Sequence, residues 1–239
     1  MKKLFIILAI ALISGSCMSQ NNKDQAYRKE RNLRNFDKIE LSGAIDLNLV
    51  QSGEEKVAVA GSSDEATAKI RTEVKGNVLK IYYNDNSFWH SGNSGKTNAY
   101  VTFKTLKGLE ISGASSAKAG NISTKNLKIE LSGASSFDGN ITVENAYLDL
   151  SGASSMHITG SASVAKIDAS GASNLKGYDL KTNFCKLEAS GASQVKIFVL
   201  KELSAEATGG SSVYYKGDCT VRESDASGGA SIKRKADRD

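Results

Sequence analysis

The side chains that come closest to a chemical pattern in this chain are carboxylates at one position of a repeat. Each stands three residues before a glycine, and Glu40 stands in the same relation to Gly43; the seven that recur every 18–20 residues are Glu110, Glu130, Asp149, Asp168, Glu188, Glu206 and Asp225. Paired carboxylates hydrolyse glycosidic bonds when the two acids differ in environment. A row of equivalent acids lacks that difference. We therefore expect a solvated charge ladder, with a stripe that binds cations or a polyelectrolyte as the alternative.

Other catalytic or metal-binding patterns are missing from the sequence. It contains no HExxH, CxxC, GxSxG or phosphate-binding loop motif. His157 occupies an outward repeat position and is expected to be solvated, and the recurrent serines have no base beside them. We predict a protein that is not an enzyme, with no catalytic residue, no cofactor and no metal site.

The glycines that define the carboxylate row belong to a repeated Ser-Gly-Ala-Ser-Ser motif. It is intact at Ser112–Ser116, Ser132–Ser136 and Ser151–Ser155 and degenerate later, and its glycines are Gly113, Gly133, Gly152, Gly171, Gly191, Gly209 and Gly228. The spacings of 20, 19, 19, 20, 18 and 19 residues predict one coil of a solenoid per repeat.

The residues around each glycine alternate between apolar and polar. Apolar side chains stand two and four residues before it and four after it, as in Leu148, Leu150 and Met156 around Gly152. Period two is typical of strands with one buried face. We predict an all-β, single-domain parallel β-helix over residues 35–232, with about ten coils of 18–20 residues. Gly43 and Gly61 would form early corners, and a right-handed coil is expected. Unrelated hairpins in a meander are the alternative.

Lysines accompany the carboxylates at two further repeat positions. Lys128, Lys166 and Lys186 stand five residues before a glycine, and the lysines five residues after one are Lys118, Lys176, Lys196 and Lys233. Like charges stacked at strand spacing repel each other. We expect both sets of lysines to share the outer face with the acids and to offset that repulsion.

A polar segment, Asn84–Asn98, interrupts the rhythm. It holds Phe88, Trp89 and His90, and Trp89 is the only tryptophan of the chain. Aromatic residues in a loop can contact a carbohydrate or a protein partner. They can equally fold back over an open rim of the solenoid, and both alternatives stay open.

The N-terminus has the pattern of an exported, lipid-anchored protein. Two lysines and the apolar run Leu4–Ile13 precede Ser14-Gly15-Ser16-Cys17, which resembles the lipobox of bacterial lipoproteins. We predict a signal peptide and lipidated Cys17 over residues 1–17, a flexible tether over 18–34 and a charged tail over 233–239. The resemblance implies membrane attachment at the outer membrane, on its periplasmic or cell-surface side.

Net charge argues against a nucleic-acid partner. Residues 1–34 hold seven Lys/Arg and two acids, a balance of +5 that equals the net charge of the whole chain. The rest of the chain holds 24 basic residues (31 less seven) and 24 acids (26 less two), so the predicted fold carries no basic footprint.

Two further cysteines, Cys185 and Cys219, fall about two coils apart, which is too far for a disulfide. Cys185 is expected in the core.

Taken together, these motifs resemble a known family. Phe36-Asp37-Lys38-Ile39, the Ser42-Gly43-Ala44 corner and the repeated corners that follow are similar to the head-GIN-domain proteins. That resemblance implies a parallel β-helix, an envelope location and a role in adhesion, and it supplies no catalytic residue.

Two functions remain as hypotheses. The first is a non-catalytic envelope lipoprotein that presents a repetitive surface for adhesion or scaffolding; the second is a glycan-binding or polysaccharide-degrading β-helix. Partners would be a glycan or an envelope or host-surface protein, and the end coils could mediate self-association. The expected contact residues are Phe88, Trp89, His90, Glu130, Asp149, Asp168, Glu188 and Glu206.

Overall fold

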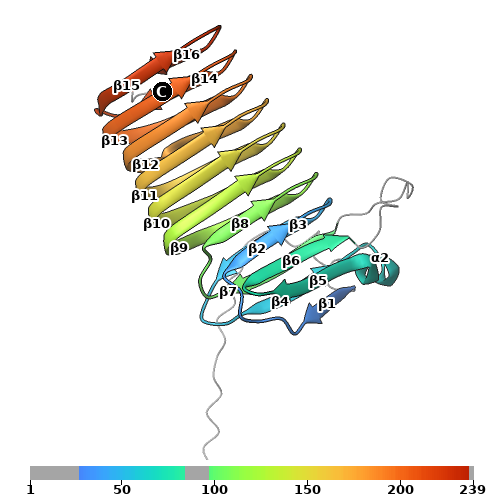
Figure 1. The fold of residues 1–239 in the computed structure, drawn as a ribbon. Coiled ribbons are helices and arrows are strands. Elements are labelled where there is room, and N and C mark those ends of the chain that lie inside the picture. The colour runs from blue at the N-terminus through green and yellow to red at the C-terminus, as the bar shows by residue number, and fades with distance from the viewer. Residues whose placement is uncertain (1–26, 84–96, 237–239) are drawn as a thin grey trace, which may run out of the picture.

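The structure, a computed structural model, describes residues 27–83 and 97–236 and places most of them in a solenoid of stacked strands (Figure 1). Its regular part has one long strand per coil: β9 (Ser116–Leu131), β10 (Ser136–Leu150), β11 (Ser155–Ala169), β12 (Asn174–Ala189) and β13 (Gln194–Ala207). Consecutive strands pair in parallel along most of their length. The predicted all-β parallel β-helix is therefore confirmed.

The Ser-Gly-Ala-Ser motif forms a tight corner at one edge of every coil (Figure 1). From Gly113 to Gly228 the corner glycines have φ between 68 and 73°. Each corner stacks on the one before it, because the residue directly after a corner glycine donates its N–H to the carbonyl oxygen of the corner glycine one coil earlier. Ala153, which follows Gly152, donates to the Gly133 oxygen in this way at 2.8 Å. A Cβ on Gly152 would lie 2.6 Å from the Gly133 oxygen, so both the backbone angle and the close stacking require glycine.

Inward side chains stack in columns along the axis. One column of buried apolar residues runs in register through Ile129, Leu148, Ile167, Leu187 and Ala205. Cys185 lies in another, and burial raises the pKa of its thiol to about 12. Cys185 and Cys219 are both free thiols, as the sequence predicted. The alternation therefore supplies one continuous apolar core.

The first third of the described chain departs from the coil pattern. Parallel rungs are formed by β2 (Lys38–Leu41), β3 (Asp46–Gln51), β6 (Val78–Tyr83), β7 (Asn98–Phe103) and β8 (Gly108–Ile111). Three further strands pair antiparallel with their neighbours and cover this end: β1 (Arg28–Arg31), β4 (Lys56–Ala60) and β5 (Ile70–Lys75).

This antiparallel cap corrects the predicted number of coils. Gly61 is not a corner: it follows β4 and leads into the short helix α2 (Asp64–Lys69), whose N-cap is Ser63. Corners stack from Gly43 directly to Gly113 and onward, which makes about seven turns rather than ten. Alternation marks a buried face but not the direction of the neighbouring strand, and the capping strands were therefore misassigned to coils.

The far end of the solenoid closes with β14 (Ser212–Lys216), β15 (Thr220–Ala226) and β16 (Ser231–Arg234). Three predicted boundaries shift. Arg28–Arg31, expected in the tether, is strand β1; β16 runs into the expected tail as far as Arg234; and Asn98, expected in the loop, begins β7. The predicted signal peptide and Cys17 lie outside the described residues. No helix within the described ranges is long and apolar enough to cross a membrane.

Candidate functional site

Two outer faces carry the candidate contact residues, and the corner separates them. The strand that enters a corner lies on one face, and after the tight turn the chain returns on the opposite face (Figure 1). Repeat positions before the glycine therefore form ladders on one face, and positions after it form ladders on the other. The sequence does not reveal this separation, because both strands alternate in the same way.

The acidic ladder occupies the entering face. Its carboxylates stand in register without a break: Glu40, Glu110, Glu130, Asp149, Asp168, Glu188, Glu206 and Asp225. The predicted contact residues Glu130, Asp149, Asp168, Glu188 and Glu206 are thus brought together as consecutive rungs. Parallel strands lie about 4.8 Å apart, which sets the spacing of the carboxylates along the axis.

Some members of the acidic ladder are paired with lysines from the same face. Lys128 lies 2.9 Å from Glu130, Lys166 lies 3.3 Å from Asp168, and Lys186 lies 3.2 Å from Glu188. Lys80 pairs with Glu40 at 2.5 Å. In each of the first three pairs the lysine precedes the acid by two residues, so both side chains project from one side of the strand.

The other members have no such lysine. At Glu110, Asp149, Glu206 and Asp225 the residue two positions earlier is Gly108, Tyr147, Ser204 or Glu223, and none of these four acids forms an ion pair within the described residues. Burial, followed by repulsion from Asp168 and Glu130, raises the pKa of Asp149. Burial, followed by repulsion from Glu40 and Glu130, likewise raises the pKa of Glu110. The ladder therefore keeps uncompensated negative charge.

The returning face carries a different ladder, which is mainly basic. In register it reads Asn48, Lys118, Asp138, His157, Lys176, Lys196, Tyr214 and Lys233. These lysines were expected beside the acids, and that expectation is wrong: they lie across the corner, and in the described part of the chain they make no ion pair with the acidic ladder. His157 is half exposed, and its Nδ1 lies 3.1 Å from an Asp138 oxygen.

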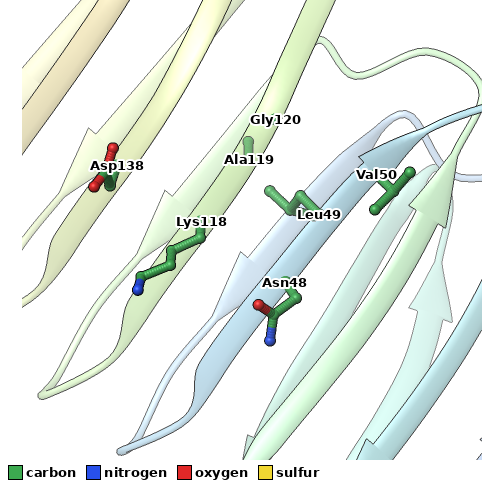
Figure 2. A pocket seen from close by; sticks show the side chains of 7 residues that line it. All are labelled: Asn48, Leu49, Val50, Lys118, Ala119, Gly120 and Asp138. Atoms are coloured by element: carbon green, nitrogen blue, oxygen red, sulfur yellow. The ribbon is translucent and has the colours of Figure 1, made fainter. Parts of the chain in front are cut away.

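A shallow polar groove runs along this basic face. One part, of about 480 Å³, is lined by Lys118, Asp138, His157 and Lys176 with the hydroxyl row Ser116, Ser136 and Ser155. The adjoining part, of about 350 Å³, shares Lys118 and Asp138 and reaches Asn48, Val50 and Gly120 (Figure 2). The groove thus presents ammonium, imidazole, carboxylate, amide and hydroxyl groups over an apolar floor.

The adjoining part of the groove exists because β3 and β9 diverge. Their pairing stops at Leu49 and Ala119, after which the Gln51 side chain takes the place of a peptide group. Gln51 accepts a hydrogen bond from the Ser123 N–H at 2.7 Å and donates to the Ser123 carbonyl at 3.0 Å. Val50 is left 59% exposed beside the recess. The spacing of the corner glycines gives no signal for this feature, because the 20 residues from Gly113 to Gly133 recur from Gly171 to Gly191.

Two further observations limit the chemistry. Within the described ranges, no group of three or more His, Cys, Asp or Glu side chains could hold a metal ion. Phe88, Trp89 and His90 lie outside the described residues, and their role stays a prediction.

A second groove, of about 200 Å³, borders the acidic ladder. It is lined by ladder acids and corner hydroxyls of three coils: Asp168, Ser170, Glu188, Ser190, Glu206 and Thr208.

Fold and surface together define a class of protein: a parallel β-solenoid that repeats charged ladders on two faces. A family model described as "putative auto-transporter adhesin, head GIN domain" matches residues 35–219, and the chain belongs to that family. The resemblance stated from the motifs is thereby confirmed. No curated protein matches the chain.

Solved structures share the architecture. A putative adhesin from Bacteroides fragilis NCTC 9343 has a TM-score of 0.82 at 23% identity, with 87% of this chain and 96% of that chain covered. A putative lipid binding protein from Parabacteroides distasonis ATCC 8503 has a TM-score of 0.68 at 20% identity, covering 87% and 96%. A putative adhesin from Parabacteroides merdae ATCC 43184 has a TM-score of 0.63 at 16% identity, covering 87% and 95%. At these identities the likeness shows the fold.

Proposed function

We propose that this chain is an exported, lipid-anchored protein of the bacterial envelope whose solenoid acts without catalysis, as a rigid surface for adhesion or scaffolding. The observation that carries the proposal is the acidic ladder, eight carboxylates in unbroken register from Glu40 to Asp225. A repeated group at fixed spacing lets weak contacts with a repetitive cationic surface add up by avidity. Membership of a family described as adhesin heads supports the same role.

Neutralising the ladder tests this proposal. The variant E130Q/D149N/D168N/E188Q keeps the shape of four consecutive rungs and removes their charge. We expect it to lose most of its retention on cationic polymers and envelope surfaces at low salt, because clustered charge drives such contacts. The matched control is E65Q/E144Q/D179N/D218N, which removes the same number of exposed acids at positions off the ladder. Equal retention of both variants and the parent would exclude the ladder as the contact.

Lipid anchoring is proposed from the lipobox-like segment that ends at Cys17. The parent protein should fractionate with membranes, and mass spectrometry of its mature N-terminus should show an acylated cysteine. Cys17→Ala should release the protein into the soluble fraction. Recovery of the unmodified cysteine in a soluble parent protein would refute the anchor.

Glycan binding in the polar groove is a second candidate function, favoured by the hydroxyl, amide and charged groups that line it. Its lining includes one carboxylate, Asp138, whereas acid-base hydrolysis of a glycoside uses two. We therefore propose binding without cleavage. The contacts predicted for Phe88, Trp89 and His90 can be tested separately by deleting residues 84–96.

A blocking substitution tests the groove. A Cβ at Gly120 would meet no atom within 4 Å, so a side chain can begin there without a clash, and Gly120→Trp should occupy the recess. Gly53→Trp is the matched control, since Gly53 is equally unobstructed and does not line the groove. In a glycan array, signals of the parent should persist in the control and disappear in Gly120→Trp. Depolymerisation of any bound polysaccharide by the parent would contradict the non-catalytic role.

A further inference from the structure

The two ends of the solenoid differ. At the N-terminal end, β4 and β1 continue the sheet beyond β7, and β5 continues it beyond β6. At the C-terminal end, β15 pairs with β13 and β16 pairs with β14, and within the described residues neither has a strand on its other side. This end therefore presents the open backbone edges of two strands, one on each face.

Core columns also end uncovered there. Val221 stacks on buried Leu203 and is nevertheless 38% exposed. Ile232 stacks on fully buried Val213 and is only partly buried. The inward positions Ser224 and Ala226 of β15 are small. The end is consequently flat enough for a strand of another molecule to approach both edges.

The two open edges carry opposite charge on their outward sides. Glu223 and Asp225 project outward from β15, in register with Ser204 and Glu206. On β16 the outward residue Lys233 stacks on Tyr214, and Lys235 follows two positions later with its Nζ 5.0 Å from the Tyr214 ring. Glu223, Asp225 and Lys233 form no ion pair within the described residues. Arg222 of β15 is paired with Glu202 at 2.9 Å, and Arg234 of β16 is paired with Asp218. The charges of the two strands that are left without an ion pair are therefore acidic on β15 and basic on β16.

From this complementarity we infer that two copies of the chain associate through their C-terminal ends, with β15 of each copy pairing antiparallel with β16 of the other. β15 and β16 run in opposite directions on opposite faces, so a two-fold axis parallel to the strands places each acidic edge against a basic edge. A two-fold axis perpendicular to the faces would instead place β15 against its own copy and oppose like charges, which is destabilising.

The same axis fixes which side chains meet. In this dimer the corners of the two copies stack on each other, and their outward faces continue one another. Glu223 stands five residues before Gly228 and Lys233 five residues after it, so Glu223 of one copy lies opposite the partner's Lys233. The two-fold symmetry makes this contact twice. The pairing covers the ends of the core columns and satisfies both open edges, and it stands independently of what the ladders bind.

Charge reversal tests the arrangement. Sedimentation equilibrium over a wide range of concentration should show a dimer for the parent. Lys233→Glu and Glu223→Lys should each raise the dimer Kd by about tenfold or more, because each opposes like charges twice across the axis. Mixing the two single variants should restore a dimer, since every contact between them again joins opposite charges. The double variant K233E/E223K should also dimerise.

Other outcomes overturn the inference. In the β15-to-β15 arrangement Glu223 and Lys233 do not face each other, so neither Glu223→Lys nor Lys233→Glu would weaken the dimer. Head-to-tail contact with the N-terminal cap would give species that grow with concentration rather than a closed dimer. A parent that stays monomeric throughout would exclude the interface, whatever the result of the ladder and groove experiments.

Discussion

The corner glycines show how one residue type sets the fold. At Gly152 a side chain would be disfavoured for two reasons, the positive φ angle and the close contact with the neighbouring corner. At Gly76 only the first reason applies, because φ is +62° but an added Cβ would have no atom within 4 Å. These positions separate two costs of adding a methyl group. The first is the angle, and the second is the displacement of a stacked peptide.

We expect Gly76→Ala to lower the free energy of unfolding by about 1 kcal/mol, the cost of the left-handed angle. Gly152→Ala should cost at least about 2 kcal/mol, because the neighbouring corner must also move. Gly120→Ala, unobstructed and without the positive angle, should be neutral. Urea unfolding measures all three. Equal effects at Gly76 and Gly152 would show that stacking adds nothing.

Buried serines form a column next to the corners, and their hydroxyls are not equivalent. The Oγ atoms of Ser115, Ser135, Ser154 and Ser173 are buried and have no hydrogen-bond partner among the residues that the structure describes. Ser211 Oγ, at the same repeat position, lies 2.9 Å from the Thr208 carbonyl and 3.1 Å from the Ala189 carbonyl.

Removing these hydroxyls should therefore have opposite consequences. Ser154→Ala should leave the free energy of unfolding unchanged or raise it, since an unpaired buried hydroxyl is costly. Ser211→Ala should lower it by about 1 kcal/mol through the lost hydrogen bonds. Thermal unfolding of the two variants side by side gives the comparison, and a larger loss for Ser154→Ala would mean that its hydroxyl is paired in solution.

At the scale of the strand, the acidic ladder makes stability depend on pH. Because the folded pKa of Asp149 lies above its unfolded value, the ionised carboxylate destabilises the fold. This destabilisation is fully present at pH values above the folded pKa of Asp149, and it is lost when the pH falls below the unfolded pKa. Asp37 has the opposite sign, because a hydrogen bond from Lys107 at 2.6 Å lowers its pKa.

Neutralising the two aspartates should shift stability in opposite directions. At neutral pH we expect Asp149→Asn to be more stable than the parent and Asp37→Asn to be less stable. The gain in Asp149→Asn should vanish when the solution is acidified below the unfolded pKa of aspartate. The loss in Asp37→Asn should vanish only below its lowered folded pKa. Unfolding free energies measured across acidic and neutral pH test both signs; a loss of stability in Asp149→Asn would contradict the repulsion within the ladder.

At the scale of the whole molecule, the long strand of each regular coil pairs only with the strands of the coils beside it, as in other solenoids. Deleting residues 152–170 removes one full coil and joins Ser151 to Gly171, which rebuilds the corner in register. We expect this variant to fold with reduced stability and to be shorter by about 4.8 Å in small-angle scattering. Deleting residues 152–161, half a coil, should prevent folding because it places strands out of register. Loss of fold in both variants would show that the coils are not interchangeable.

The sequence predicted the regular two thirds of the solenoid because its information is local: a glycine every 18–20 residues and alternation around it. It failed at Gly61, where the same alternation belongs to an antiparallel strand followed by a helix. The acidic row was found by counting. Two features have no counterpart in the local pattern, because they depend on contacts between distant segments. One is the position of Lys118 and Lys176 on the opposite face, and the other is the replacement of a peptide group by the Gln51 side chain beside a recess.

The uniform corner also bears on how such a chain can change over evolutionary time. Because a Ser-Gly-Ala-Ser turn accepts an identical neighbour above and below it, an in-frame duplication of some 19 codons would insert cleanly between existing turns, leaving the cap and the open end as they were. The length of the solenoid could then be tuned in discrete steps by copying errors alone, without any new sequence having to be selected.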